Sequence, residues 1–325
     1  MHNNGVGSPV ITDCTFLNNV ATNNAGGGMA TDLGSTAVIS NCSFDGNVSN
    51  GSGGGMDNYD TNVAVTNCTF NANTAVEGGG MSTRLGSPTI IGCTFTDNTA
   101  IEGGAMLNCF DSLTTVTDCS FQDNSATGSG GAMYNNRVVT VVTDCAFVGN
   151  SAVDGGGLNN NGGGLTIGFC VFTGNIATGE GGGLMGEDGS IIDISDCTFS
   201  GNVAGIIGGG VLNLNDCEES FFTLSGSILC DNSPENIEGN WIDGGGNCLA
   251  ILCTDLNGDG VPDICDAAPC PADTDANGTV NVTDLLALLA AWGPCEAPCP
   301  PDINTDCTVN VTDLLALLAA WGACP

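Results

Sequence analysis

Two segments near the C-terminus place oxygen-bearing side chains at the spacing of a calcium-binding loop. In each segment such side chains occupy loop positions 1, 3, 5, 9 and 12, and the backbone carbonyl at position 7 is available. This spacing lets an EF-hand loop surround Ca²⁺ with hard oxygen ligands. The alternative is an Asp/Asn-rich turn that binds no metal, and the duplication of the pattern disfavours it. We therefore expect Ca²⁺ as the cofactor. The first set is Asp273, Asp275, Asn277, Thr279, Asn281 and Asp284, and the second is Asp302, Asn304, Asp306, Thr308, Asn310 and Asp313.

The two loops differ at their sharp turn, where Gly278 of the first loop is replaced by Cys307 in the second. A non-glycine residue held at positive φ costs on the order of 1–2 kcal/mol. The difference predicts either a weaker second site or a Cys307 that is held in place by a disulfide.

A third acidic loop lies upstream, within residues 251–269, and no helical segment follows it directly. It resembles a thrombospondin type 3 repeat, and the resemblance implies that bound calcium stiffens a linker at this point. Its expected ligand positions are Asp255, Asn257, Asp259, Val261, Asp263 and Asp266.

Each C-terminal loop runs into the same leucine-rich segment, which predicts two short helices that are too short to span a bilayer. With Asp at position 12 and no helix before the loop, residues 270–325 resemble a dockerin type I module. The resemblance implies a cohesin-like receptor or a cell-surface matrix as partner. The leucines also fit a core between the two halves, and we expect that role for most of them. The positions that match the family's receptor contacts are Val282, Thr283, Leu286, Val311, Thr312 and Leu315.

Cysteines flank both halves of this module at equivalent positions. The simplest pairing is Cys270 with Cys295 and Cys299 with Cys324, and a crossed pairing remains open.

The elements upstream are set by a unit of about 26 residues that recurs through the first 230 residues. Each unit contains Cys-x-Phe-x-x-Asn and then a run of glycines. A fixed period of this length indicates a solenoid, and the absence of helical periodicity favours short strands. We therefore predict an all-β fold, a parallel β-helix of about nine coils over residues 1–250, with a small α module at its C-terminal side. The repeated cysteines are Cys14, Cys42, Cys68, Cys93, Cys119, Cys145, Cys170 and Cys197.

Within a coil, Cys and Phe share one face of a strand, so we expect both to stack inside the solenoid. The cysteines should be buried thiols that pack as small apolar side chains. Turns are expected at Thr66-Asn67 and its equivalents, and at the Asn three residues after each Phe, because Asn tolerates left-handed backbone. The glycines allow a tight corner against the next coil.

The tetrapeptides Phe121-Gln-Asp-Asn124 and Gly130-Gly-Ala-Met133 resemble the repeats of chlamydial polymorphic outer-membrane proteins and related right-handed β-helices. The resemblance covers about residues 1–235 and implies a right-handed coil. The segment that begins at Met1 matches the segment after a glycine run, so we expect the sequence to start inside a coil, with further coils and a secretion signal upstream.

The chain has 36 acidic and two basic residues, a formal charge of −34. This charge excludes nucleic acids and anionic membranes as electrostatic partners and favours divalent cations. No apolar stretch is long enough to span a bilayer. Nineteen cysteines favour an oxidising compartment, so we expect a secreted or cell-surface protein.

The leading functional hypothesis is a calcium-binding β-helix that acts as an adhesin, structural rod or glycan-binding module, anchored through the dockerin-like region. The alternative is a polysaccharide-degrading enzyme similar to pectate lyases or polygalacturonases, with polysaccharide as its partner. Glu77 and Glu102, which precede the glycine run in adjacent coils, are the best acidic pair for catalysis. Asp154 and Glu180 occupy the same position further on, which favours a solvated carboxylate ladder instead.

Overall fold

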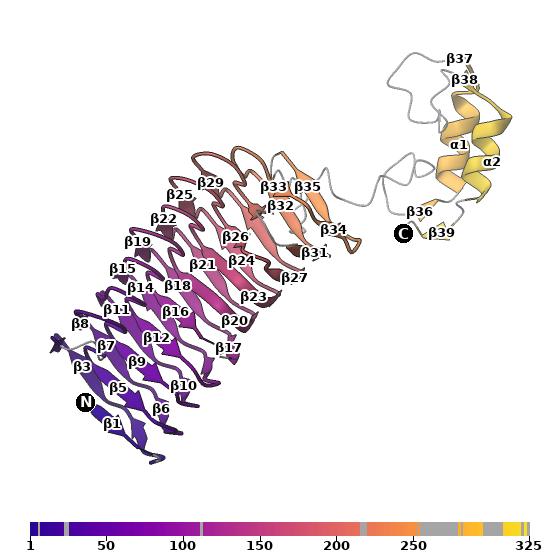
Figure 1. Cartoon of the computed structure of the whole chain (residues 1–325). Coiled ribbons are helices and arrows are strands. Elements are labelled where there is room, and N and C mark those ends of the chain that lie inside the picture. The colour runs from indigo at the N-terminus through magenta and orange to yellow at the C-terminus, as the bar shows by residue number, and fades with distance from the viewer. Residues whose placement is uncertain are drawn as a thin grey trace. The chain divides into compact units, whose positions relative to one another are not determined.

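The computed structural model describes residues 1–5, 7–22, 26–110, 113–214, 220–251, 253, 279–280, 282–294, 308–319 and 322–323. The chain divides into two compact units, Met1–Cys253 and Thr254–Pro325. The first unit is a solenoid of short parallel strands that confirms the predicted all-β coil (Figure 1).

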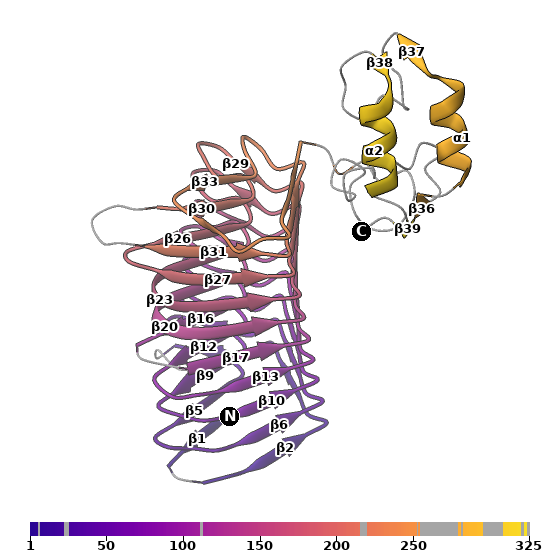
Figure 2. The ribbon, with the colours of Figure 1, turned by 90° about the vertical axis from the view of Figure 1, so that its right-hand side faces the viewer.

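The largest sheet contains 18 strands arranged as two strips, and consecutive coils add strands in order (Figure 2). Strands of the first strip directly follow a glycine run in every case but β1 and β33. The strip contains β1 (His2–Asn4), β5 (Met29–Asp32), β9 (Met56–Tyr59), β12 (Met81–Arg84), β16 (Met106–Cys109), β26 (Leu184–Glu187), β30 (Val211–Asn213) and β33 (Ile237–Gly239). Strands of the second strip precede the repeated cysteine: β2 (Val10–Thr12), β6 (Val38–Ser40), β10 (Ala64–Thr66), β13 (Thr89–Ile91), β17 (Leu113–Thr117), β27 (Ile191–Ser195), β31 (Phe221–Ser225) and β34 (Ile242–Asp243). Two longer strands, β20 (Met133–Thr143) and β23 (Leu158–Gly168), run through both strips.

The eight Cys-x-Phe segments, a ninth copy in which Ser227 replaces the Cys, and one further strand form a second sheet of ten strands. These strands are β3 (Thr15–Leu17), β7 (Ser43–Asp45), β11 (Thr69–Asn71), β14 (Thr94–Thr96), β18 (Ser120–Gln122), β21 (Ala146–Val148), β24 (Val171–Thr173), β28 (Thr198–Ser200), β32 (Ile228–Cys230) and β35 (Cys248–Ala250). Two-residue strands make the third side: β4 (Val20–Ala21) with β8 (Val48–Ser49), and β15 (Thr99–Ala100), β19 (Ser125–Ala126), β22 (Ser151–Ala152), β25 (Ile176–Ala177) and β29 (Val203–Ala204).

The phenylalanines of the repeat stack inside the coil as predicted. Their ring centroids lie 4.4–4.9 Å apart in successive coils, and neighbouring rings are within 8° of parallel. Parallel in-register pairing places Phe70 directly opposite Phe95. The ring separation therefore follows the spacing between hydrogen-bonded strands, which is ~4.8 Å. All of these rings are buried except Phe16 of the first coil, which is partly exposed.

The repeated asparagines form a buried ladder that links successive coils. Asn73 donates from both its backbone nitrogen and its side-chain Nδ2 to the Oδ1 of Asn98, at 3.0 Å in each case. The same Nδ2 also donates to the carbonyl of Phe44, in the preceding coil. The expected left-handed backbone lies one residue earlier, at Ala72 and Asp97, rather than at the asparagines themselves. The asparagine side chain points inward, and the preceding residue makes the bend.

The repeated thiols are free, and those from Cys42 to Cys197 are buried as predicted. The prediction was wrong for Cys14 of the first coil, which is exposed. The thiols are also more than apolar fillers, since the backbone N–H of Cys93 donates to Sγ of Cys119 at 3.3 Å. In the ninth repeat, Ser227 Oγ accepts the corresponding bond from Cys197 at 3.0 Å.

The corner positions follow the predicted backbone chemistry, with one shift. The bend before the ten-stranded sheet comprises Asn67 and Cys68, one residue later than expected, with Asn67 at φ 51°. In the glycine run, a Cβ on Gly79 would lie 2.3 Å from the carbonyl oxygen of Gly104 in the next coil. Only glycine fits at that close approach.

The last coil is closed by a disulfide that the repeat pattern did not predict. Cys230 and Cys253 are bonded, with their Cα atoms 5.3 Å apart. Cys248 of the same region is disulfide-bonded too.

The second unit contains two equivalent helices, α1 (Val282–Ala290) and α2 (Val311–Ala319), within its described residues. Two short antiparallel pairs cross between the halves. β36 (Thr279–Val280) pairs with β39 (Gly322–Ala323), and β37 (Gly293–Pro294) pairs with β38 (Thr308–Val309). The segment before each helix is thus hydrogen-bonded to the segment after the other helix.

We predict that Asn98→Ala lowers the free energy of unfolding of the β-helix by about 3 kcal/mol, because two buried donors of Asn73 lose their acceptor. Urea-induced unfolding monitored by circular dichroism measures the change. Asn71→Ala in the preceding coil is the control, since its side chain donates to Asp45 at the surface, and it should cost less than about 0.5 kcal/mol. Equal losses for the two variants would contradict a structural role for the ladder.

We predict that Cys119→Ser is tolerated better than Cys119→Ala, by about 1 kcal/mol in the free energy of unfolding. A serine oxygen can accept the Cys93 N–H as Ser227 accepts that of Cys197, whereas alanine leaves the buried N–H without an acceptor. If the alanine variant is as stable as the serine variant in the same urea experiment, apolar packing alone explains the cysteine ladder.

Candidate functional site

Two carboxylates of the C-terminal unit are buried at equivalent positions of the two halves. Asp284 in the first turn of α1 and Asp313 in the first turn of α2 are both 0% exposed. Both make interactions within the chain. Residues 254–325 include no Lys, Arg or His, so the unit itself offers no side-chain cation to either carboxylate. Burying an ionised carboxylate without a positive partner costs several kcal/mol.

Asn310 and Asp313 form a reciprocal cap at the start of α2. Oδ1 of Asn310 accepts a hydrogen bond from the Thr312 backbone nitrogen at 2.8 Å. Oδ2 of Asp313 accepts one from the Asn310 backbone nitrogen, also at 2.8 Å. This capping box fixes the Asp313 carboxylate at the helix N-terminus, which favours negative charge.

The helices present different leucines to the core and to the surface. Leu288 and Leu317 pack with Val280 and Val309 in a small buried cluster. Leu286 and Leu315 are each 61% exposed, so the core role considered for them is wrong. All six positions that match receptor contacts in the dockerin family are exposed: Val282, Thr283, Leu286, Val311, Thr312 and Leu315.

Most of the expected calcium ligands lie outside the described residues, as do the proposed flanking disulfides. Of the two C-terminal sets, the structure describes Asp284, Asn310 and Asp313, together with the backbone of Thr279 and Thr308. The third loop, from Asp255 to Asp266, also lies outside them. Within the described part of the chain, no group of three or more His, Cys, Asp or Glu side chains is arranged to hold a metal ion.

A second candidate site lies on the outer face of the first strip. Along each strand of this strip, alternate side chains point into the core and outward, so Ser82 and Arg84 of β12 face outward while Met81 belongs to the core. Nη2 of Arg84 lies 2.9 and 3.1 Å from the two carboxylate oxygens of Asp57 on β9. Its guanidinium also lies 5.5 Å from the ring centroid of Tyr59.

Burial dominates the electrostatics of this outer face. It raises the pKa of Asp57 to about 6, and the Arg84 guanidinium opposes part of the rise. The pKa of Cys109 is raised to about 12 by burial first and by the Glu77 carboxylate second. Burial and nearby Glu102 raise the pKa of Tyr134 as well. These side chains therefore share one electrostatic environment.

The structure brings Glu77 and Glu102 into register on adjacent coils, beside this outer face. Glu77 accepts a hydrogen bond from the Ser52 hydroxyl at 2.9 Å. Burial raises the pKa of Glu102, and the Glu77 carboxylate adds to the rise. Further along the same ladder, Asp154 accepts from the Glu180 backbone nitrogen at 3.0 Å.

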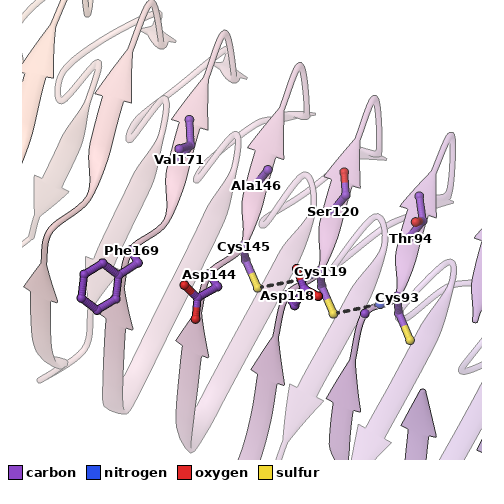
Figure 3. Close-up of a pocket in the computed structure, with 11 residues that line it drawn as sticks. Cys93, Thr94, Asp118, Cys119, Ser120, Asp144, Cys145, Ala146, Phe169 and Val171 are labelled. Carbon is purple, nitrogen blue, oxygen red and sulfur yellow. Dashed lines mark hydrogen bonds between the residues drawn. The ribbon is translucent and has the colours of Figure 1, made fainter. Parts of the chain in front are cut away.

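A separate hollow of about 430 Å³ follows the corner between the second strip and the ten-stranded sheet. Figure 3 shows Asp118, Asp144 and the ring of Phe169 along this corner, with the hydrogen-bonded cysteines Cys119 and Cys145 beside them. Sequence reasoning did not anticipate this hollow. It arises where small side chains follow one another at the corner of successive coils.

Comparison with known families gives two matches. Residues 2–172 match the model described as right handed beta helix region. Residues 169–187 match the model of the Chlamydia polymorphic membrane protein repeat. No significant match was found among curated proteins or among solved structures. No helix in the described residues is long and apolar enough to cross a membrane.

We predict that the Asp57 carboxyl titrates near pH 6 in the folded protein, against 3.8 for an unperturbed group. Between these values the folded chain holds a proton that the unfolded chain has lost, so this group lowers stability as pH rises from about 4 to 6. NMR titration of the Asp57 side-chain carboxyl tests the value. Arg84→Met should raise the midpoint by about one pH unit or more, whereas Arg137→Met should leave it unchanged. A midpoint near 4 would contradict the dominant effect of burial, and no response to Arg84→Met would contradict the assigned ion pair.

Proposed function

The chain belongs to the right-handed β-helix family, and we propose that it is a secreted or cell-surface rod anchored through a calcium-dependent C-terminal module. The family match confirms the predicted β-helix, and the repeat match supports a surface role. The rod is a passive or adhesive element in this proposal, and the C-terminal unit provides attachment.

The burial of Asp284 and Asp313 is the observation that carries the proposal. Two equivalent carboxylates are withdrawn from water in a segment that contains no basic side chain. A hard divalent cation prefers carboxylate and carbonyl oxygens, and it would neutralise both carboxylates. The donor set therefore fits Ca²⁺.

In this proposal the first ion is held by Asp273, Asp275, Asn277, Asn281 and Asp284 with the carbonyl of Thr279. The second is held by Asp302, Asn304, Asp306, Asn310 and Asp313 with the carbonyl of Thr308. Bound calcium neutralises carboxylates that otherwise repel one another. Because binding requires the folded form, its free energy adds to the stability of the unit.

The crossed strand pairs support a joint folding of both halves. Thr279 belongs to the first loop, and its strand pairs with the segment that follows α2. Thr308 belongs to the second loop, and its strand pairs with the segment that follows α1. A loop that holds calcium therefore also holds one strand of a pair whose other strand belongs to the other half.

The exposed apolar side chains of the two helices offer the docking surface. Val282 and Leu286 on α1 are exposed, and so are Val311 and Leu315 on α2. We propose a cohesin-like receptor or a cell-surface matrix as the partner, in keeping with the dockerin-like sequence. The alternative function, a polysaccharide-degrading enzyme, is supported only by the in-register pair Glu77 and Glu102.

Calorimetric titration of the full chain with Ca²⁺ tests the proposal. We predict that Asp284→Asn and Asp313→Asn each bind one calcium ion fewer than the unchanged chain, because each variant removes a carboxylate ligand. Chelation should also lower the helical circular dichroism signal while leaving the β-helix intact, since two short helices lack support of their own. We further expect the loop with Gly278 to bind more tightly than the loop with Cys307.

Asp97→Asn is the matched control, because it removes the same charge from an exposed corner of the β-helix. It should bind as many calcium ions as the unchanged chain. No heat of binding at about 1 mM Ca²⁺, or an unchanged helical signal after chelation, would overturn the calcium-dependent module.

A further inference from the structure

The hollow at the corner between the second strip and the ten-stranded sheet combines an aromatic ring with carboxylates and has no basic side chain in its lining. Its volume is about 430 Å³. One row of lining residues follows the corner through successive coils, and it consists of Gly92, Asp118, Asp144 and Phe169. The second row is the outward face of β14, β18, β21 and β24, and it ends at Val171. Figure 3 shows the two rows side by side.

Phe169 is the lining residue that the fold itself does not require. Its side chain is 62% exposed, and its backbone φ is 55°. The equivalent residues of the neighbouring coils are Asp144 and Asp196, at φ 54° and 52°. Asp and Asn tolerate this left-handed backbone, whereas a bulky side chain is uncommon there. The ring therefore contributes an exposed aromatic surface to the hollow rather than packing to the core.

The thiols beneath the hollow are already engaged within the coil. Sγ of Cys119 accepts a hydrogen bond from the Cys93 backbone nitrogen at 3.3 Å and donates to the carbonyl of Thr117 at 3.2 Å. Sγ of Cys145 makes the same pair of contacts, with the Cys119 backbone nitrogen at 3.4 Å and the Thr143 carbonyl at 3.1 Å. A ligand in the hollow therefore meets these sulfurs as a polarizable surface and binds through the side chains of the rim.

The charges at the rim select a cation. Asp118 and Asp144 are exposed and occupy equivalent positions of coils that are ~4.8 Å apart. The ion pairs among the described residues involve Asp32 and Asp57 instead. The chain's one His and two Arg lie on β1, β12 and β20, away from this corner. An anionic ligand would be repelled here, whereas a cation would meet two carboxylates and the face of an aromatic ring.

The kind of cation follows from the same lining. Within the described part of the chain, no group of three or more acidic, Cys or His side chains is arranged to hold a metal ion. A compact divalent ion would therefore find too few oxygen ligands at this corner. An organic ammonium gains from the ring face as well as from the carboxylates, and its carbon chain can cover the apolar side chains of Ala146 and Val171.

We propose that this corner hollow binds an alkylammonium ligand, a protonated primary amine carried on an aliphatic chain. The ammonium group lies between the Asp144 carboxylate and the face of the Phe169 ring, and the aliphatic chain packs over Val171. A second ammonium group on the same ligand reaches Asp118, one coil away. Free polyamines and the lysine side chains of a partner protein both carry this group. The site uses no residue of the C-terminal unit, so it is independent of calcium-dependent attachment.

NMR titration of the full chain, followed on the ring signals of Phe169 and the methyl signals of Val171, tests the inference. The probes are cadaverine and spermidine for free polyamines, Nα-acetyl-lysine amide for a protein side chain, and Mg²⁺ as the inorganic comparison. The buffer contains chelator, except in the Mg²⁺ arm, and about 20 mM salt, because salt screens exposed charges. We expect cadaverine to bind with a Kd below about 10 mM and Mg²⁺ to leave the Phe169 ring signals unchanged.

The ratio of affinities identifies the source of the ligand. Tighter binding of the two polyamines than of the lysine compound assigns the hollow to free polyamines, which place an ammonium group at each carboxylate. Equal or tighter binding of the lysine compound assigns it to a lysine side chain of a partner protein. No shift with any of the three amines, or the same shift with Mg²⁺ at equal concentration, would overturn the proposal.

Two matched pairs of variants separate this site from the general attraction of an acidic chain for cations. Phe169→Leu keeps an apolar side chain but removes the ring face, so it should weaken cadaverine binding by about two- to fivefold, read from the Val171 methyl signals. Phe110→Leu is its control, since Phe110 is 59% exposed at φ 61° and does not line the hollow. Asp144→Asn should weaken binding by about threefold, and Asp97→Asn, which removes the same charge from another exposed corner, should leave it unchanged.

Thermal unfolding of each variant shows that the fold is kept. Equal losses in Phe169→Leu and Phe110→Leu, or in Asp144→Asn and Asp97→Asn, would show that cations bind to the overall negative charge, and the proposed site would be wrong.

Discussion

The parallel hydrogen bonds between successive coils fix the whole first unit, because they set one rise per coil and one register for every side chain. Phe70 lies opposite Phe95 and Asn73 beneath Asn98 because the backbone leaves no other arrangement. An inward polar residue in such a stack has no water available, so it must find its partner in the coil above or below. The asparagine side chain meets this demand, because one amide group joins three coils.

The same constraint explains why the repeat tolerates so little variation inside the coil and so much outside. A residue at an inward position must match its neighbours in size and hydrogen bonding, as the replacement of Cys by Ser227 illustrates. An outward residue lies outside the stacked core, and its main contacts within its ladder are its two neighbours. Unusual residues can therefore accumulate on one face without disturbing the core, and the first strip carries Tyr59, Arg84 and Tyr134 on such a face.

The C-terminal unit is organised on a different principle. Its apolar cluster has four fully buried side chains among the described residues. Its carboxylates Asp284 and Asp313 are withdrawn from water without a basic residue in the unit. In the proposed function, Ca²⁺ neutralises these charges and its binding free energy adds to the stability of the unit.

The sequence by itself determined the coil, because the spacing of Cys, Phe, Asn and Gly leaves a single periodic solution. It also determined which side chains stack inside, and it marked Asp284 and Asp313 as candidate ligands. Only the tertiary structure decided which residue of each bend adopts positive φ, that the thiols accept backbone hydrogen bonds, and that Cys230 bonds Cys253. The structure likewise decided that Leu286 and Leu315 are exposed while Leu288 and Leu317 are buried. In the β-helix, these features depend on contacts with residues about 25 positions away in the next coil. In the C-terminal unit, they depend on contacts with the other half of the duplicated module. The residue types along the chain do not specify the geometry of either set of contacts.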